Sequence, residues 1–187
     1  AALIYIRRHP DTVRSAILNG IAPISFTNPL YHAINAQKGL ERIFAECEAD
    51  PIYREAFPDL RKKFQVILER LDKGPVTVAV THPATKEKIP VKLSRSAFAG
   101  ALRVMMYYLP GNRKVPLLLQ RAYEGDYEPF ALQGIASNRA IRNIICFGML
   151  MSVTGSEDIP RIDPDSIPLL TKETFLGDVR VRTQMAV

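Results

Sequence analysis

The sequence predicts a mainly helical fold that carries one small β-hairpin and is preceded by the end of a helix and a strand. Three observations predict it. Apolar residues recur at positions i, i+3, i+4 and i+7 over several stretches, which is the spacing of an amphipathic helix. One stretch, residues 76–93, instead alternates apolar and polar residues, as half-buried strands do. The first twenty residues follow neither pattern for long, so they form a different kind of segment.

The N-terminal stretch carries the end of a helix that stops at Pro10 and then a short apolar run over residues 15–18. Asn19 and Gly20 end that run with a turn, so it is predicted as a short strand. A single strand leaves the N–H and C=O groups of both its edges without partners. We therefore expect the helix end and the strand to belong to a larger sheet.

Two amphipathic helices are predicted after a proline-containing loop. The apolar face of the first consists of Leu40, Ile43, Phe44 and Cys47. The apolar face of the second consists of Leu60, Phe64, Ile67, Leu68 and Leu71. The second helix closes at residues 73–75, where Lys-Gly-Pro is typical of a helix end.

Residues 76–93 are predicted as a β-hairpin, because apolar positions alternate on both sides of a polar turn. Pro90 has no N–H group to give to a ladder, which places its strand at an edge. Ser94 is predicted to cap the next helix. The apolar positions of that helix are Phe98, Leu102, Met105, Met106 and Leu109.

The C-terminal half is predicted to hold a short helix, then one long central helix over residues 129–153 whose wide apolar face is covered on most sides. Gly134 and Gly148 lie inside it, and each costs about 1 kcal/mol relative to alanine unless it permits close packing. A proline-rich loop, a short helix around residues 170–175 and a tail complete the chain.

Composition argues against several classes of function. The net charge of +6 comes without an aromatic-interleaved basic stripe, which favours a solvated surface over a nucleic-acid partner. No apolar run approaches the roughly 20 residues that span a bilayer, so no membrane partner is expected. The histidines His9, His32 and His82 are far apart and are predicted at the surface, and no cysteine–histidine cluster has the spacing of a metal site. Neither a metal nor a cofactor is expected.

Cys47 and Cys146 each lie on the apolar stripe of a predicted helix. Two cysteines allow one disulfide, and two buried free thiols fit the sequence equally well. The run of Met and Tyr at residues 105–108 could line an apolar pocket, but helical spacing favours a place in the core.

Residues 151–160, MSVTGSEDIP, contain two adjacent acids, Glu157 and Asp158, which follow a glycine turn at the end of an apolar helix. Such a pair of carboxylates can bind a cation. The alternative is structural: either acid could cap the next turn or pair with Arg161.

Three stretches resemble bacterial α/β-hydrolases of the tripeptidyl-aminopeptidase and prolyl-iminopeptidase-like serine hydrolases. YIRRHPDTVRSAILNGIAP is similar to the family's helix after the nucleophile elbow and the core strand that follows, often written YLRRYPERVRSVVLDGVAP. FAECEADPIYREAFPDL resembles the first helical pair of the family's cap domain, and MSVTGSEDIP resembles the cap segment SVTCAEDVP. The three stretches occur in the family's order and are distributed along the chain between residues 5 and 160.

The resemblance implies a division into three parts. Residues 1–25 would be a remnant of the α/β-hydrolase core, residues 26–168 the helical cap domain, and residues 169–187 the exit helix and tail that return toward the core. The family's Ser, Asp and His occur in that order along the chain, with the Ser in a G-x-S-x-G turn. No G-x-S-x-G occurs here, so the nucleophile is expected before Ala1 and the Asp and His beyond Val187.

The resemblance therefore implies a cap that gates the substrate cleft and contains no catalytic residue itself. Its partners would be the rest of the hydrolase core and a peptide or ester substrate. Glu157 and Asp158 would lie near the mouth of the active site, where a carboxylate can hold the α-ammonium group of a peptide. Tyr53 and Gly155 stand where relatives often have cysteines, which leaves both a secreted or periplasmic and a cytoplasmic location open.

Two other classes of function remain open from the sequence. The chain could be a stand-alone helical module that binds protein or nucleic acid, or an oligomerisation domain. Apolar surface on an isolated cap would also allow a homodimer.

Overall fold

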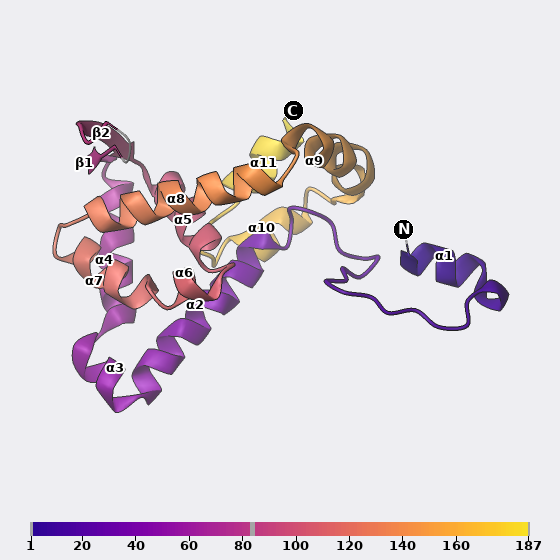
Figure 1. Cartoon of the computed structure of the whole chain (residues 1–187), viewed down its shortest axis with the longest axis horizontal. Coiled ribbons are helices and arrows are strands. Elements are labelled where there is room, and N and C mark those ends of the chain that lie inside the picture. The colour runs from indigo at the N-terminus through magenta and orange to yellow at the C-terminus, as the bar shows by residue number, and fades with distance from the viewer. Residues whose placement is uncertain (1, 83–84, 187) are drawn as a thin grey trace.

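The structure is a computed structural model that describes residues 2–82 and 85–186. It is mainly helical and contains a small two-stranded antiparallel sheet (Figure 1). The α-helices are α1 (Ala2–Arg8), α2 (His32–Ala49), α3 (Pro51–Ala56), α4 (Leu60–Asp72), α5 (Arg95–Met105), α6 (Leu109–Asn112), α7 (Val115–Tyr123), α8 (Glu128–Ile144), α9 (Phe147–Val153), α10 (Ser166–Thr171) and α11 (Val179–Met185). The strands are β1 (Val76–Thr81) and β2 (Lys88–Leu93), and short turns of helix occupy Pro10–Thr12, Thr154–Asp158 and Ile159–Arg161.

Side-chain caps fix where several helices begin. Asp50 accepts hydrogen bonds from the N–H groups of Ile52 and Tyr53 and so starts α3. Ser94 accepts from the N–H group of Ala97 at 3.2 Å and starts α5, as the sequence predicts. Each cap satisfies a backbone donor that the first turn of a helix leaves without a partner.

The β-hairpin predicted over residues 76–93 is confirmed. Its two strands pair with Val76 opposite Leu93 and with Val80 opposite Ile89. Val78, Val80 and Leu93 are buried while their neighbours along each strand are not, so one face of the hairpin packs on the helices. The turn includes residues 83 and 84, which lie outside the described residues.

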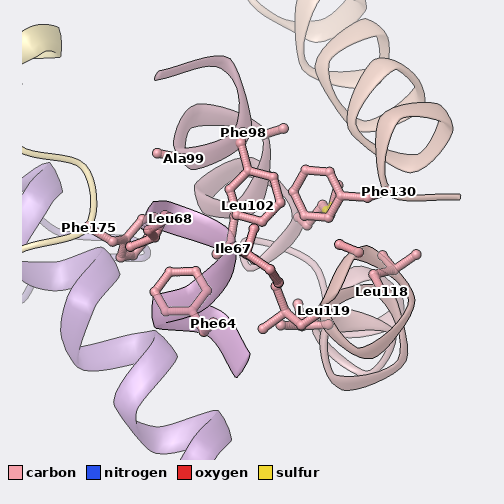
Figure 2. Packing of buried hydrophobic residues seen from close by; sticks show 14 of the residues in the cluster. Phe64, Ile67, Leu68, Phe98, Ala99, Leu102, Leu118, Leu119, Phe130 and Phe175 are labelled. Atoms are coloured by element: carbon pink, nitrogen blue, oxygen red, sulfur yellow. The ribbon is translucent and has the colours of Figure 1, made fainter. Parts of the chain in front are cut away.

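The core is a hydrophobic cluster between α2, α4, α5, α7 and α8 in which several phenylalanine rings contact one another (Figure 2). The rings of Phe98 and Phe130 stack with their centroids 4.1 Å apart, and both residues are fully buried. Phe64 meets Phe175 edge to face, with centroids 5.8 Å apart. Offset and edge contacts of this kind add to the apolar area that the rings bury. Phe175 joins the core from the C-terminal part of the chain, so that part folds back onto the helical body.

Gly134 brings α8 close to α5. A Cβ atom at this position would lie 2.9 Å from the Cβ atom of Ala101 and 3.5 Å from Cε of Met105. Gly148 has open space around it. The predicted cost of a glycine inside the long helix is therefore offset by close packing at Gly134 but not at Gly148.

The long predicted helix over residues 129–153 is two helices. α8 ends at Ile144, Cys146 has extended backbone angles, and α9 begins at Phe147. The expectation that this segment is covered on most sides is wrong for its second half, because Ile144, Phe147 and Met149 are exposed. A helix that leaves the core has no tertiary packing to keep it continuous.

The C-terminal segment also differs from the expectation. A helix runs over Ser166–Thr171 rather than around residues 170–175, and the tail contains α11. Val181 of α11 is buried against Leu30, Ile162 and Ile167 in a second, smaller core. The tail therefore belongs to the folded body.

Residues 2–26, which we call the N-terminal arm, extend away from the helical body (Figure 1). The predicted helix end before Pro10 is present as α1. No strand forms over residues 15–18, because no other strand of the described chain lies beside them to pair with. The large apolar side chains of the arm that are exposed are those of Ile4, Tyr5, Ile17, Leu18, Ile21 and Ile24.

Candidate functional site

The stretch MSVTGSEDIP lies where α9 ends and the chain turns toward α10. Residues Thr154–Asp158 form one turn of π-helix, and a 3₁₀ turn follows directly. Single π-turns are rare and frequently occur at functional sites. Thr154 is fully buried, and its hydroxyl group accepts a 3.4 Å hydrogen bond from Nδ2 of Asn28. The turn is thereby fixed to the segment that leads into α2.

Arg161 ties the same stretch to the N-terminal arm. Its guanidinium group donates to the backbone carbonyl oxygens of Ile24 at 2.8 Å and Phe26 at 3.3 Å. It also donates to the carbonyl oxygen of Glu157 at 2.7 Å and forms a 2.9 Å ion pair with Asp158. Arg161 therefore holds the end of the arm against the π-turn.

The two predicted binding acids consequently lie in different surroundings. The carboxylate of Asp158 is mostly covered and already paired with Arg161, which is the structural alternative for this residue. Glu157 is exposed, and its carboxylate makes no hydrogen bond or ion pair with any residue in the described part of the chain. Of the two, only Glu157 presents a free carboxylate to an incoming cation.

A second polar cluster joins three helices on the C-terminal side of the body. Arg180 of α11 donates from Nε to Nδ1 of His32 in α2 at 3.0 Å. Arg103 of α5 donates from Nη1 to the hydroxyl group of Tyr107 at 2.7 Å, and its guanidinium group lies 5.1 Å from the centre of that ring. Among the residues that the structure describes, the cluster thus contains two arginines, a histidine and a tyrosine, and no carboxylate.

Burial and the two arginines govern protonation in this cluster. Burial, followed by the charges of Arg103 and Arg180, lowers the pKa of His32 from 6.5 to about 3. His32 is therefore neutral at pH 7, and its Nδ1 atom can accept the hydrogen bond from Arg180. Burial and the charge of Arg103 also lower the pKa of Arg180 below its usual value, since both disfavour the charged form.

Sequence reasoning missed this cluster. His32 was expected at the surface, but it is half-buried against α5 and α11. The expectation that residues 105–108 lie in the core holds for Met105, which is buried, and in part for Met106, which packs against the core, but Tyr107 and Tyr108 are exposed. Arg103, with apolar neighbours on both sides in a helix, was the one available signal, because a charged residue at such a position needs a specific reason to be buried.

The cysteines also differ from the expectation that both lie on apolar helix faces. Cys47 is buried in α2, and burial raises the pKa of its thiol, with smaller contributions from Glu46, Glu48 and Asp50. Cys146 is exposed in the break between α8 and α9. Both thiols are free.

Searches of the described residues found no group of histidine, cysteine and acidic side chains that could hold a metal ion. No described helix is long and apolar enough to cross a membrane.

No protein-family model, curated protein or solved structure matches this chain. Function is therefore inferred from the geometry together with the resemblance of the three sequence stretches.

Proposed function

We propose that the chain is the substrate-gating cap of an α/β-hydrolase-fold serine hydrolase, with a peptide substrate that carries a free amino group. The observation that carries the proposal is the N-terminal arm. It has the apolar content of a core segment, yet six of its large apolar side chains are exposed to solvent.

The arm includes Ile17, which is fully exposed, and Tyr5 and Ile21, of which more than half is exposed. Extensive exposed apolar surface is typical of a site that another part of a protein covers. The resemblance identifies the occupant as the hydrolase core, where residues 15–18 would become a strand paired on both edges. Pairing would satisfy the backbone groups that the lone segment leaves to water.

The covered surface would extend beyond the arm. The exposed apolar side chains at the end of α8 and in α9 are Ile144, Ile145, Phe147, Met149 and Val153. The end of α8 and α9 lie on the same side of the body as the arm (Figure 1). A core that packs against both would place the π-turn of residues 154–158 at the junction between cap and core, where the family's cleft opens.

Glu157 would then face the cleft. Its carboxylate is exposed and unpaired in the described chain, whereas Asp158 and Arg161 hold the backbone around it in one conformation. A carboxylate in a partly dry cleft binds an ammonium group through charge-assisted hydrogen bonds and fixes the position of the scissile bond. The cap would thereby select peptides with a free N terminus.

The test uses Glu157→Gln in the complete enzyme, with Glu69→Gln as the matched control. Glu69 is an exposed acid of α4, on the opposite side of the body from α9 (Figure 1). We expect Glu157→Gln to lower kcat/KM for free-amine peptides by at least about tenfold, and for N-blocked esters far less, because only the former lose a charge-assisted contact. The control should leave both unchanged. Equal losses on both substrates would contradict the role of Glu157.

The isolated chain provides a second test, because it contains no nucleophile elbow. It should not react with a fluorophosphonate probe for activated serines. Stoichiometric labelling of one serine would contradict the assignment as a cap and show that this chain carries its own catalytic site.

A further inference from the structure

Within residues 2–82 and 85–186, the cluster of Arg103 and Arg180 has no partner of opposite charge. Arg103 is only 9% exposed, so most of its guanidinium hydration is lost. Its hydrogen-bond partner is a tyrosine hydroxyl group, and that of Arg180 is a neutral imidazole. Among residues 2–82 and 85–186, neither arginine lies within ion-pair distance of an acidic side chain.

Six other arginines of the chain do have an acidic partner. Those that form ion pairs are Arg42, Arg61, Arg95, Arg121, Arg161 and Arg182. All of them are more exposed than Arg103. Burial of a cation without an opposite charge costs free energy, and two such cations close together add to that cost. An anion bound between them would offset it.

There is room for such an anion. Arg103 and Arg180 both line a pocket of about 560 Å³ between α5, α8 and α11. Its other polar lining includes Asn138, Thr183 and Gln184, while Val104 and Leu176 contribute apolar wall. A buried oxygen in the same lining, Oε1 of Gln184, accepts no hydrogen bond from the described chain.

We propose that this pocket binds the free C-terminal carboxylate of a short peptide between Arg103 and Arg180. Guanidinium groups pair with carboxylates through parallel hydrogen bonds, and they do so more strongly where water is excluded. The amide side chains of Asn138 and Gln184 suit peptide groups, and the apolar wall suits a side chain. The identification of the anion as a peptide carboxylate rests on the proposed function, whereas the presence of an anion site does not.

A titration of the isolated chain tests the proposal, followed by the NMR signals of the arginine side chains or by calorimetry. The ligands are the tripeptide Ala-Ala-Phe, the same peptide with a C-terminal amide, and inorganic phosphate. We expect the free acid to bind and the amide to bind at least about tenfold more weakly, because the amide removes the charge that the arginines recognise. Phosphate should compete only weakly.

Arg180→Gln should weaken binding of the free acid by at least about tenfold. Arg182→Gln is the matched control, because Arg182 lies two residues along the same helix, is exposed and pairs with Asp178. Arg103→Lys provides a second variant that keeps the buried charge while it removes the paired N–H groups. It should also weaken binding.

Three results would overturn the proposal. The first is equal binding of the acid and the amide, and the second is an Arg180→Gln variant that binds as the unchanged chain does. The third is the absence of saturable shifts up to roughly 10 mM peptide, where a site with two arginine contacts is occupied. Tight phosphate binding with no peptide binding would show a phosphate site instead. None of these results depends on the hydrolase assignment, since the titration needs no catalytic triad.

Discussion

Nε of Arg180 lies 3.0 Å from Nδ1 of His32, and this hydrogen bond joins the last helix of the chain to the first turn of α2. The bond requires a neutral imidazole, because a protonated histidine has no acceptor atom. Two residues separated by most of the chain thus fix both the position of α11 and the protonation state of His32.

The stability of the protein should therefore depend on the protonation of His32. Because the pKa of His32 is about 3 in the folded chain and 6.5 in the unfolded chain, the unfolded state binds the additional proton first as pH falls. The contribution of His32 to the free energy of unfolding is fully present above pH 6.5 and is lost as pH falls from 6.5 toward 3. Urea denaturation between pH 7 and pH 4 measures it.

His32→Gln keeps an acceptor at this position but cannot take up the proton, so its stability should fall less steeply over that range. His9→Gln is the control, because His9 is exposed in the arm, and this variant should keep the original slope. If the free energy of unfolding falls equally steeply with pH in His32→Gln and in the wild-type chain, protonation of His32 does not contribute to the pH dependence of stability.

Gly134→Ala should destabilise the protein by about 1–3 kcal/mol, because its methyl group would meet the Cβ atom of Ala101 at 2.9 Å and force α8 away from α5. Gly148→Ala should be neutral or stabilising by up to about 1 kcal/mol, because the space around it is open and alanine favours helix. Chemical denaturation of the two variants provides a matched comparison. Equal changes in both would refute the close contact between α5 and α8.

Cys146 should react with a thiol reagent much faster than Cys47. Cys146 is exposed, whereas Cys47 is buried and its thiol has a raised pKa, so less thiolate is available. Under native conditions we expect one fast equivalent and one slow equivalent, and Cys146→Ser should remove only the fast one. Two fast equivalents would indicate that α2 is not packed as described.

Ile17→Asp should have little effect on the stability of the isolated chain, where this side chain is fully exposed. In the complete hydrolase that we propose, it should destabilise by about 2–5 kcal/mol, because a charge would then be buried in the core without a partner. Ile52→Asp, at an exposed position of α3, should change neither protein by more than about 0.5 kcal/mol. A harmless Ile17→Asp in the complete protein would show that the arm stays exposed.

Local patterns predict those parts of the fold that local physics determines. The apolar face of residues 40–47 becomes the buried side of α2, and the alternation of residues 76–93 becomes the hairpin. Both patterns consist of residues close together in the sequence, and burial of the apolar face stabilises the helix and the hairpin. The side-chain cap at Ser94 is local for the same reason.

Features that depend on distant partners could not be predicted in this way. Residues 15–18 have the composition of a strand, but pairing requires a second strand that composition does not provide. The helix breaks at Cys146 because α8 leaves the core there. The sequence remains apolar across this point, so it does not indicate the break. The pairing of Arg180 with His32 joins segments that only the tertiary fold brings together.

The candidate site shows the same division. The acids Glu157 and Asp158 were identified from sequence, but their different surroundings depend on Arg161 and on the carbonyl oxygens of the arm. The pocket lined by Arg103 and Arg180 was indicated in the sequence only by Arg103, a charged residue among the apolar positions of α5.

The coding DNA on both sides of this chain provides the sharpest test of the proposal that it is the cap of a serine hydrolase. We expect a G-x-S-x-G motif encoded a few codons before Ala1, and an Asp followed by a His encoded beyond Val187. A start codon directly at Ala1 together with a stop codon after Val187 would contradict it. The chain would then be a free-standing helical protein, and its exposed apolar arm would need a different partner.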